Sequence, residues 1–343
     1  MFKIIKTKAT LSGDAILQTI LYSDIFDFPL SKRELWYYLK NHIPIDRKEF
    51  LSALKVLPSN IIKIRNYYCI INREDLIKRR LTHERVSKKK YKVARKAALA
   101  LSFIPTVCFI GISGSLAAKN ASVEDDIDFF IITKKHALWV TRLYCLLILQ
   151  VMGLRRSKFS QHAIDKVCLN MIIDEQRLAL PISRHDVYTA HEIAQLKPLF
   201  ERKNTFRKFI FANNWTRKFM PHFLGNRFEI SNFRQKLERF LIWRTMCWIG
   251  AVLISSSIFE KIARKSQLWY IQKNKTNETV SLSLLAFHPQ DYRLKVLAEY
   301  NSLLKQYECR YSISDSKREF SVVPPVFNIK KSIKARSRLS LLT

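Results

Sequence analysis

The stretch "TVCFIGISGSLAAKNASVEDDIDFFIIT", residues 106–133, decides how the middle of the chain folds. It opens with β-branched and aromatic residues, turns at a glycine, and ends in a second apolar run, "IDFFIIT". Runs of this length and composition predict two buried strands. Four acidic residues, Glu124, Asp125, Asp126 and Asp128, stand where the second strand begins. Unpaired ionised carboxylates are costly to bury, so these acids either hold a cation or form an ordinary turn.

Asp126 and Asp128 are separated by one residue, so in a strand both carboxylates point to the same face. Two converging carboxylates suit a hard divalent cation such as Mg²⁺. Gly114 and Ser115 follow the first strand and would place backbone N–H groups and a hydroxyl at a helix N-terminus, where phosphate is readily held. A shifted arrangement with Glu124 and Asp126 as the ligands is the alternative; the buried strand that begins after Asp126 favours Asp126 with Asp128.

Gly-Ser, ten residues and then Asp-x-Asp, in "GSLAAKNASVEDDID", resembles the signature of the nucleotidyltransferase superfamily related to DNA polymerase beta. The resemblance implies that Gly114 and Ser115 contact the triphosphate of an NTP and that Asp126 and Asp128 bind Mg²⁺ or Mn²⁺. It implies transfer of a nucleoside monophosphate to an acceptor, with release of pyrophosphate. The whole-chain order also resembles prokaryotic proteins with a winged helix before such a domain and helices after it.

Many active members of that superfamily carry a third carboxylate on a later strand. The corresponding strand here, "VCLNMII", offers Asn170, whose amide can ligate a metal but cannot accept a proton at neutral pH. Asp165 and Asp174 flank this strand as substitutes. A catalytically inactive protein that binds nucleic acid or regulates a partner is therefore the alternative function.

Residues 1–72 predict a winged helix-turn-helix: three short helices and a hairpin around Arg65-Asn66. Ser31, followed by Glu34 three residues later, has the spacing of a capping box, and Asp46 is expected to cap the third helix. That helix carries Arg47 and Lys48, so the unit either contacts DNA or RNA or docks a protein.

The formal net charge of +32 favours a polyanionic partner such as nucleic acid or a nucleotide. Residues 73–103 form a basic, helical connector. Its run Lys88-Lys89-Lys90 is expected to be a solvated face, or else to steer a polyanion toward the acidic cluster.

The predicted fold class is α+β or α/β. A small mixed-sheet core covers residues 104–185, a mainly helical C-terminal domain residues 186–311, and a basic, largely irregular tail residues 312–343. In the helical part, Glu192 could reach the site as a base, although a structural role is favoured for its neighbour His191; His288 is expected in a turn. The apolar segment 240–259 contains Arg244 and reads as a buried helix rather than a membrane span. Without an N-terminal signal-like apolar region, the expected location is cytoplasmic.

Overall fold

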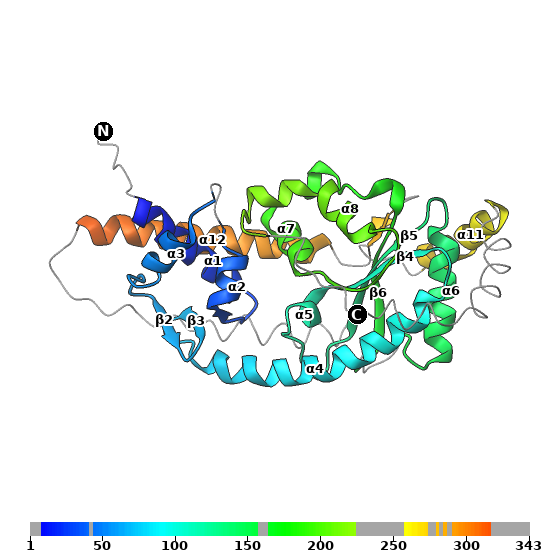
Figure 1. Ribbon diagram of the computed structural model, residues 1–343, viewed down its shortest axis with the longest axis horizontal. Helices are drawn as coiled ribbons and strands as arrows, with labels where there is room; N and C mark the ends of the chain where they lie inside the picture. The colour runs from blue at the N-terminus through cyan, green and yellow to red at the C-terminus, as the bar shows by residue number, and fades with distance from the viewer. Residues whose placement is uncertain are drawn as a thin grey trace.

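The computed structural model describes residues 8–40, 44–156, 164–223, 257–273, 279–280, 284–286 and 290–316. These residues form helices and two separate β-sheets, which confirms a mixed α+β protein. The long helix α4 (Asp75–Ser102) runs from a small N-terminal unit to the larger sheet (Figure 1). Position within α4 therefore decides which unit a residue contacts.

The N-terminal unit combines three helices with a three-stranded antiparallel sheet of order β1-β3-β2. Ser31 caps its second helix, and the Ser31–Glu34 capping box is present as predicted. The two longer strands form the expected hairpin, turning at Arg65, whose φ of 53° is left-handed. In chain order the elements are α1 (Lys8–Asp24), β1 (Leu30–Ser31), α2 (Lys32–Tyr37), α3 (Arg47–Ala53), β2 (Ile61–Ile64) and β3 (Tyr67–Ile70).

The C-terminal helix α12 (Gln290–Ser316) packs on this N-terminal unit. Its Val296 and Tyr300 are buried in the same hydrophobic cluster as α1, and the Tyr300 hydroxyl donates to the Gln18 carbonyl at 3.2 Å. On the other side, Arg80 of α4 bonds Glu34 of α2 at 2.7 Å. Helices α12 and α4 thus both contact the N-terminal unit.

The central sheet has six strands in the order β7-β4-β5-β6-β9-β8. Strand β5 runs antiparallel to β4 and parallel to β6, which makes a mixed sheet as expected. The strands are β4 (Val107–Ile112), β5 (Ile127–Thr133), β6 (Val167–Asp174), β7 (Lys197–Glu201), β8 (Thr279–Val280) and β9 (Leu284–Ala286).

The prediction that residues 186–311 form a mainly helical domain of their own is wrong, because β7, β8 and β9 complete the central sheet. Strand β7 contains Pro198, which lowers its strand signal in the sequence; a proline is tolerated there because β7 is an edge strand. Strands β8 and β9 are only two and three residues long, too short to show an alternating pattern.

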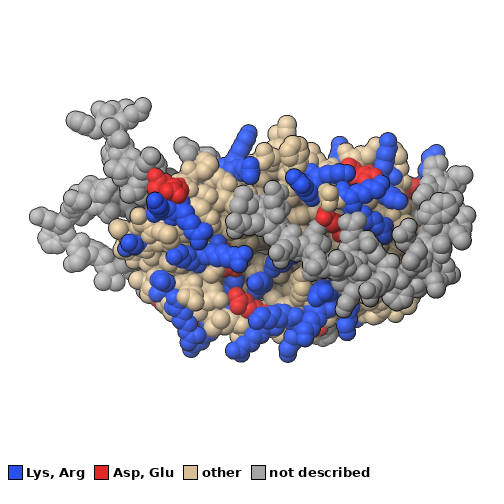
Figure 2. Space-filling model, viewed as in Figure 1, with Lys and Arg blue, Asp and Glu red and all other residues tan. Residues whose placement is uncertain are grey.

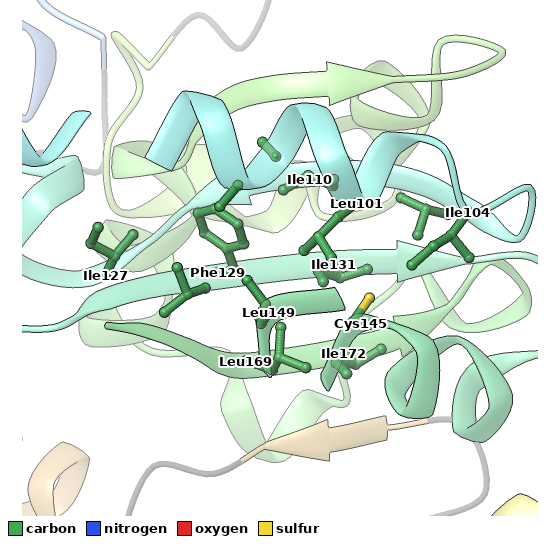
Figure 3. Packing of buried hydrophobic residues seen from close by; sticks show 14 of the residues in the cluster. Leu101, Ile104, Ile110, Ile127, Phe129, Ile131, Cys145, Leu149, Leu169 and Ile172 are labelled. Atoms are coloured by element: carbon green, nitrogen blue, oxygen red, sulfur yellow. The ribbon is translucent and has the colours of Figure 1, made fainter. Parts of the chain in front are cut away.

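Alternation along β5 separates two cores. Ile127, Phe129 and Ile131 pack with α4 and α6 (Leu138–Val151), where Leu101 and Leu149 also lie (Figure 3). The opposite face contributes Phe130 and Ile132 to a second core with α7 (Val187–Gln195) and α8 (Thr205–Ala212). Asp126 and Asp128 share the period of that second face, so the sheet presents them toward the α7 side.

Several predictions fall on residues that the structure does not describe. Residues 240–256 of the apolar segment, His288 and residues 317–343 of the tail lie outside the described ranges, whereas residues 312–316 continue α12 as helix. Among the helices described, none is both long enough and apolar enough to cross a membrane.

Candidate metal and nucleotide site

Two of the four acids in the opening stretch converge. One oxygen each of Asp126 and Asp128 lies together with the Cys168 sulfur, all three within 4.8 Å of one another. Asp128 is the second residue of β5 and pairs directly with Cys168 of the parallel strand β6. The predicted pair therefore comes together at the start of β5, next to Cys168, which is not among the predicted site residues.

Gly114 forms the wall of this site opposite Asp128. Its φ of +62° is left-handed, and a Cβ built on it would lie 2.6 Å from Asp128 Oδ2. A glycine is therefore required both by the backbone conformation and by the close approach of the carboxylate. The preceding residue completes the link, since the Ser113 N–H donates to the Asp128 carbonyl at 2.9 Å.

Ser115, which is predicted to contact phosphate, belongs to a hydrogen-bonded loop. Its hydroxyl donates to Asp125 Oδ2 at 2.7 Å, and Asp125 also accepts from the hydroxyl of Ser122 at 2.6 Å and from the Ser122 N–H at 3.1 Å. Asp125 thus ties the loop before β5 to the turn after β4. The helix that begins here, α5 (Gly114–Ala117), has only four residues, so its dipole gives little support for the phosphate site expected from the sequence.

Glu124 lies apart from the pair formed by Asp126 and Asp128. Glu124 is exposed and outside the cluster, so the arrangement with Glu124 and Asp126 as a pair is not the one that the structure brings together. Asp126 accepts through Oδ2 from Arg156 at 2.5 Å, and its side chain is 17% exposed. The Arg156 guanidinium offsets one of the two negative charges at the start of β5.

Burial is the main influence on the pKa values of Asp128 and Cys168. It raises the pKa of Asp128 well above the usual value, and the neighbouring Asp126 carboxylate raises it further, while Arg156 opposes both. Burial also raises the pKa of the Cys168 thiol, with Asp128 and Asp126 adding to the shift. A protonated thiol is a poor ligand for Mg²⁺, whereas two carboxylates beside a glycine turn fit an ion that takes one or two carboxylates together with substrate phosphates.

Asn170, the possible third position, lies on β6 beyond the pairing of Asp128 with Cys168. Between the pairs Asp128–Cys168 and Phe130–Met171, β6 has one residue more than β5. Asn170 lies in this irregular part of β6, and its Nδ2 donates to the Ser113 hydroxyl at 3.1 Å. In "VCLN", Cys168 and Asn170 alternate with apolar residues, which indicates that both face the same side of the strand. The pattern does not show which residue of β6 pairs with Asp128.

The expectation of a solvated Lys88-Lys89-Lys90 face fails at Lys90, which is only 2% exposed. Its ammonium donates to the carbonyls of Val123 and Asp125 at 2.9 and 2.7 Å and pairs with Asp165 at 3.0 Å. Helix α4 therefore holds the acidic loop in place through a buried cation. Asp165, one of the substitutes considered for the third carboxylate, is engaged in this structural contact.

His191 and Glu192 point in different directions. The His191 ring lies between Tyr22 and Tyr38, with centroids at 4.8 and 4.5 Å, and is buried. Glu192 instead lines a cavity of about 280 Å³ whose wall includes Ser113 and Asn170. Burial raises the pKa of Glu192 to about 7.

The outward side of α4 is strongly basic. Five exposed residues recur at helical spacing opposite the buried face, over about 27 Å at 1.5 Å per residue. They are Lys78, Arg85, Lys89, Lys92 and Lys96. Lys and Arg side chains line the lower edge in Figure 2, where α4 runs in Figure 1. A groove of about 200 Å³ in the N-terminal unit adds Lys32, Arg33 and Lys63.

No protein-family model, no curated protein and no solved structure matches this chain.

Proposed function

We propose that this chain is a Mg²⁺-dependent nucleotidyltransferase that moves a nucleoside monophosphate from an NTP to an acceptor. The observation that carries the proposal is the convergence of Asp126 and Asp128 against the left-handed Gly114 turn. The order of strands supports it: β4 and β5 are antiparallel neighbours joined through that turn, and β6 lies parallel to β5.

In this proposal Asp126 and Asp128 hold Mg²⁺, or Mn²⁺ in its place. An ion held by these two carboxylates would supply positive charge to neutralise the phosphates and polarise the α-phosphate. The chain's own part is to present two carboxylates at the start of β5, with the Asp128 carboxylate packed against Gly114. Arg156 bonds Oδ2 of Asp126, and no hydrogen bond from a described residue reaches Oδ1.

The helices and hairpin before the core support a winged-helix unit, since their order is helix, strand, two helices and two strands, with the first strand paired to the last. A second candidate function, a nucleic-acid-binding or regulatory protein without turnover, is favoured by the basic row on α4 and by the absence of a carboxylate at Asn170. The binding of a nucleic acid to such a row of cations depends strongly on salt concentration.

The test compares the double variant Asp126→Asn, Asp128→Asn with Glu124→Gln, a control in the exposed acid of the same cluster. Mn²⁺ binding is measured by electron paramagnetic resonance, and binding of each Mg–NTP by calorimetry. We expect the double variant to lose about tenfold or more in both affinities, as changes at metal sites commonly cost, with an unchanged melting temperature. Glu124→Gln should bind as the parent does.

Equal Mg–NTP binding by the double variant and the parent would overturn the site assignment. A loss in Glu124→Gln instead would support the shifted pair Glu124 and Asp126. If labelled RNA or DNA is bound by parent and double variant alike, with a steep salt dependence and no nucleotide transfer, the second candidate is the function.

A further inference from the structure

The cavity beside the acidic pair lies on the sheet face covered by α7 and α8. It has a volume of about 280 Å³, close to the lower end of the ~300–1,000 Å³ typical of small-molecule sites. Ser113 belongs to its wall and donates its N–H to the Asp128 carbonyl at 2.9 Å. The cavity is therefore next to the proposed metal site, and its size suits a small molecule rather than a polymer.

One end of this cavity is a carboxylate end. Glu192 enters from α7, and Asn170 enters from β6 with its amide fixed to the Ser113 hydroxyl at 3.1 Å. A hydroxyl group held here would face a carboxylate that can accept its proton.

The other end is a guanidinium end, made by Arg184 and Arg293. Arg293 of α12 is held by Asp186 through Nε at 2.6 Å and by the Ser183 carbonyl at 2.8 Å. Burial lowers the pKa of Arg184, and the neighbouring Arg293 lowers it further. Arg184 and Arg293 thus bring two guanidinium groups to this end of the cavity, and a guanidinium can pair with an anionic group of a ligand.

Between these ends the lining is apolar. It comes from both strands and helices of the second core and matches an aliphatic or aromatic body. The apolar lining consists of Phe130, Met171, Leu180, Ile193, Leu196, Phe209 and Ala286.

We infer that this cavity is the acceptor site and that it takes a small hydroxyl-bearing organic acid, with its hydroxyl at Glu192 and its anionic group at Arg184 and Arg293. The inference rests on the proposed nucleotidyl transfer. In the step, the acceptor O–H proton passes to the Glu192 carboxylate and the acceptor oxygen forms a bond to the α-phosphorus of the NTP. The bond from that phosphorus to the bridging oxygen breaks, and pyrophosphate leaves with the electron pair.

Three matched probes test the cavity in the full-length protein: 3-(4-hydroxyphenyl)propionate, 3-phenylpropionate without the hydroxyl, and 4-ethylphenol without the anion. Binding is measured by ligand-observed NMR without nucleotide or metal. We expect Arg184→Met to weaken binding of both acids about tenfold and to leave 4-ethylphenol unchanged, as loss of one charge-assisted contact predicts. Arg207→Met, in an exposed arginine of α8, is the matched control and should change nothing.

Glu192→Gln keeps the shape of the side chain and separates binding from chemistry. It should bind 3-(4-hydroxyphenyl)propionate within about twofold of the parent affinity while slowing its Mg–NTP-dependent nucleotidylation about 100-fold, as loss of a general base predicts. A kcat that is unchanged in Glu192→Gln would overturn the role of Glu192.

The two proposals fail in different ways. Intact Mg–NTP binding with no binding of either acid, or with acid binding that is equal in Arg184→Met and the parent, would overturn the acceptor site and leave the proposed function standing. Acid binding that depends on Arg184 in a protein that binds no Mg–NTP would overturn the proposed function and the acceptor role with it.

Discussion

Two glycines of this chain have nearly the same backbone conformation in different surroundings, and they allow the site geometry to be tested. Gly114 has a φ of +62° and Gly153 a φ of +65°. A Cβ at Gly153, which follows α6, would meet no atom within 4 Å, whereas a Cβ at Gly114 would lie 2.6 Å from Asp128 Oδ2. The pair Gly114→Ala and Gly153→Ala therefore separates the cost of a left-handed residue from the cost of displacing the carboxylate.

The left-handed conformation costs an L-residue about 1–2 kcal/mol, and both variants should lose this amount of unfolding free energy. At Gly114 the added contact is with the end of a side chain, so Asp128 can turn aside at an expense of about 0.5–1.5 kcal/mol for a strained rotamer. We therefore expect Gly114→Ala to be about 1 kcal/mol less stable than Gly153→Ala. The functional effect should be larger, because the displaced carboxylate no longer converges with Asp126.

Urea unfolding followed by circular dichroism measures the stability difference, and electron paramagnetic resonance measures Mn²⁺ binding in the same samples. Gly153→Ala should bind Mn²⁺ as the parent does, and Gly114→Ala about tenfold more weakly. Equal Mn²⁺ affinity in the two variants would refute the reasoning, because it would mean that the Asp128 carboxylate does not depend on the open space at Gly114.

Two further predictions concern cations away from the site. Lys40 is 5% exposed, burial lowers its pKa to about 7, and the unfolded chain keeps this proton until about pH 10. The unfolding free energy of the parent therefore rises with pH between these values, whereas that of Lys40→Met does not depend on this proton. In urea titrations, the difference in unfolding free energy between Lys40→Met and the parent should change by about 2 kcal/mol in favour of the parent from pH 7 to pH 9. A constant difference would contradict the lowered pKa. Arg202 donates hydrogen bonds to four carbonyls around the end of α4, including that of Ser102 at 2.7 Å. Arg202→Met should therefore lower the unfolding free energy by about 3 kcal/mol in the same assay. A loss under about 1 kcal/mol would show that these bonds are dispensable.

The strand pattern of β5 could be predicted because it depends on local alternation. The period of two places Ile127 and Phe129 in one core and Phe130 in the other, and the same period sends both carboxylates to one face. The Ser31–Glu34 capping box was predictable for the same reason, since its partners are three residues apart.

What could not be predicted depends on contacts between distant segments. Asp128 stands across from Cys168 because of the register of β5 and β6, and no local signal fixes the register of two parallel strands. Lys90 looked solvated because its neighbours in sequence are lysines, but the helix turns it inward to the loop 33 residues later. Position on a helix face decided its role, and composition could not show it.

The acidic cluster in a strongly basic chain has a physical account that combines these contacts. Glu124 stays in solvent, and Asp125 accepts bonds from Ser115 and Ser122 that shape the loop. The loop carbonyls, rather than its carboxylates, receive the buried ammonium of Lys90. Because the loop is held in this way, the carboxylates of Asp126 and Asp128 can stand close together. Among the described residues, Arg156 is the cation that pairs with them, which leaves charge for a metal ion to neutralise.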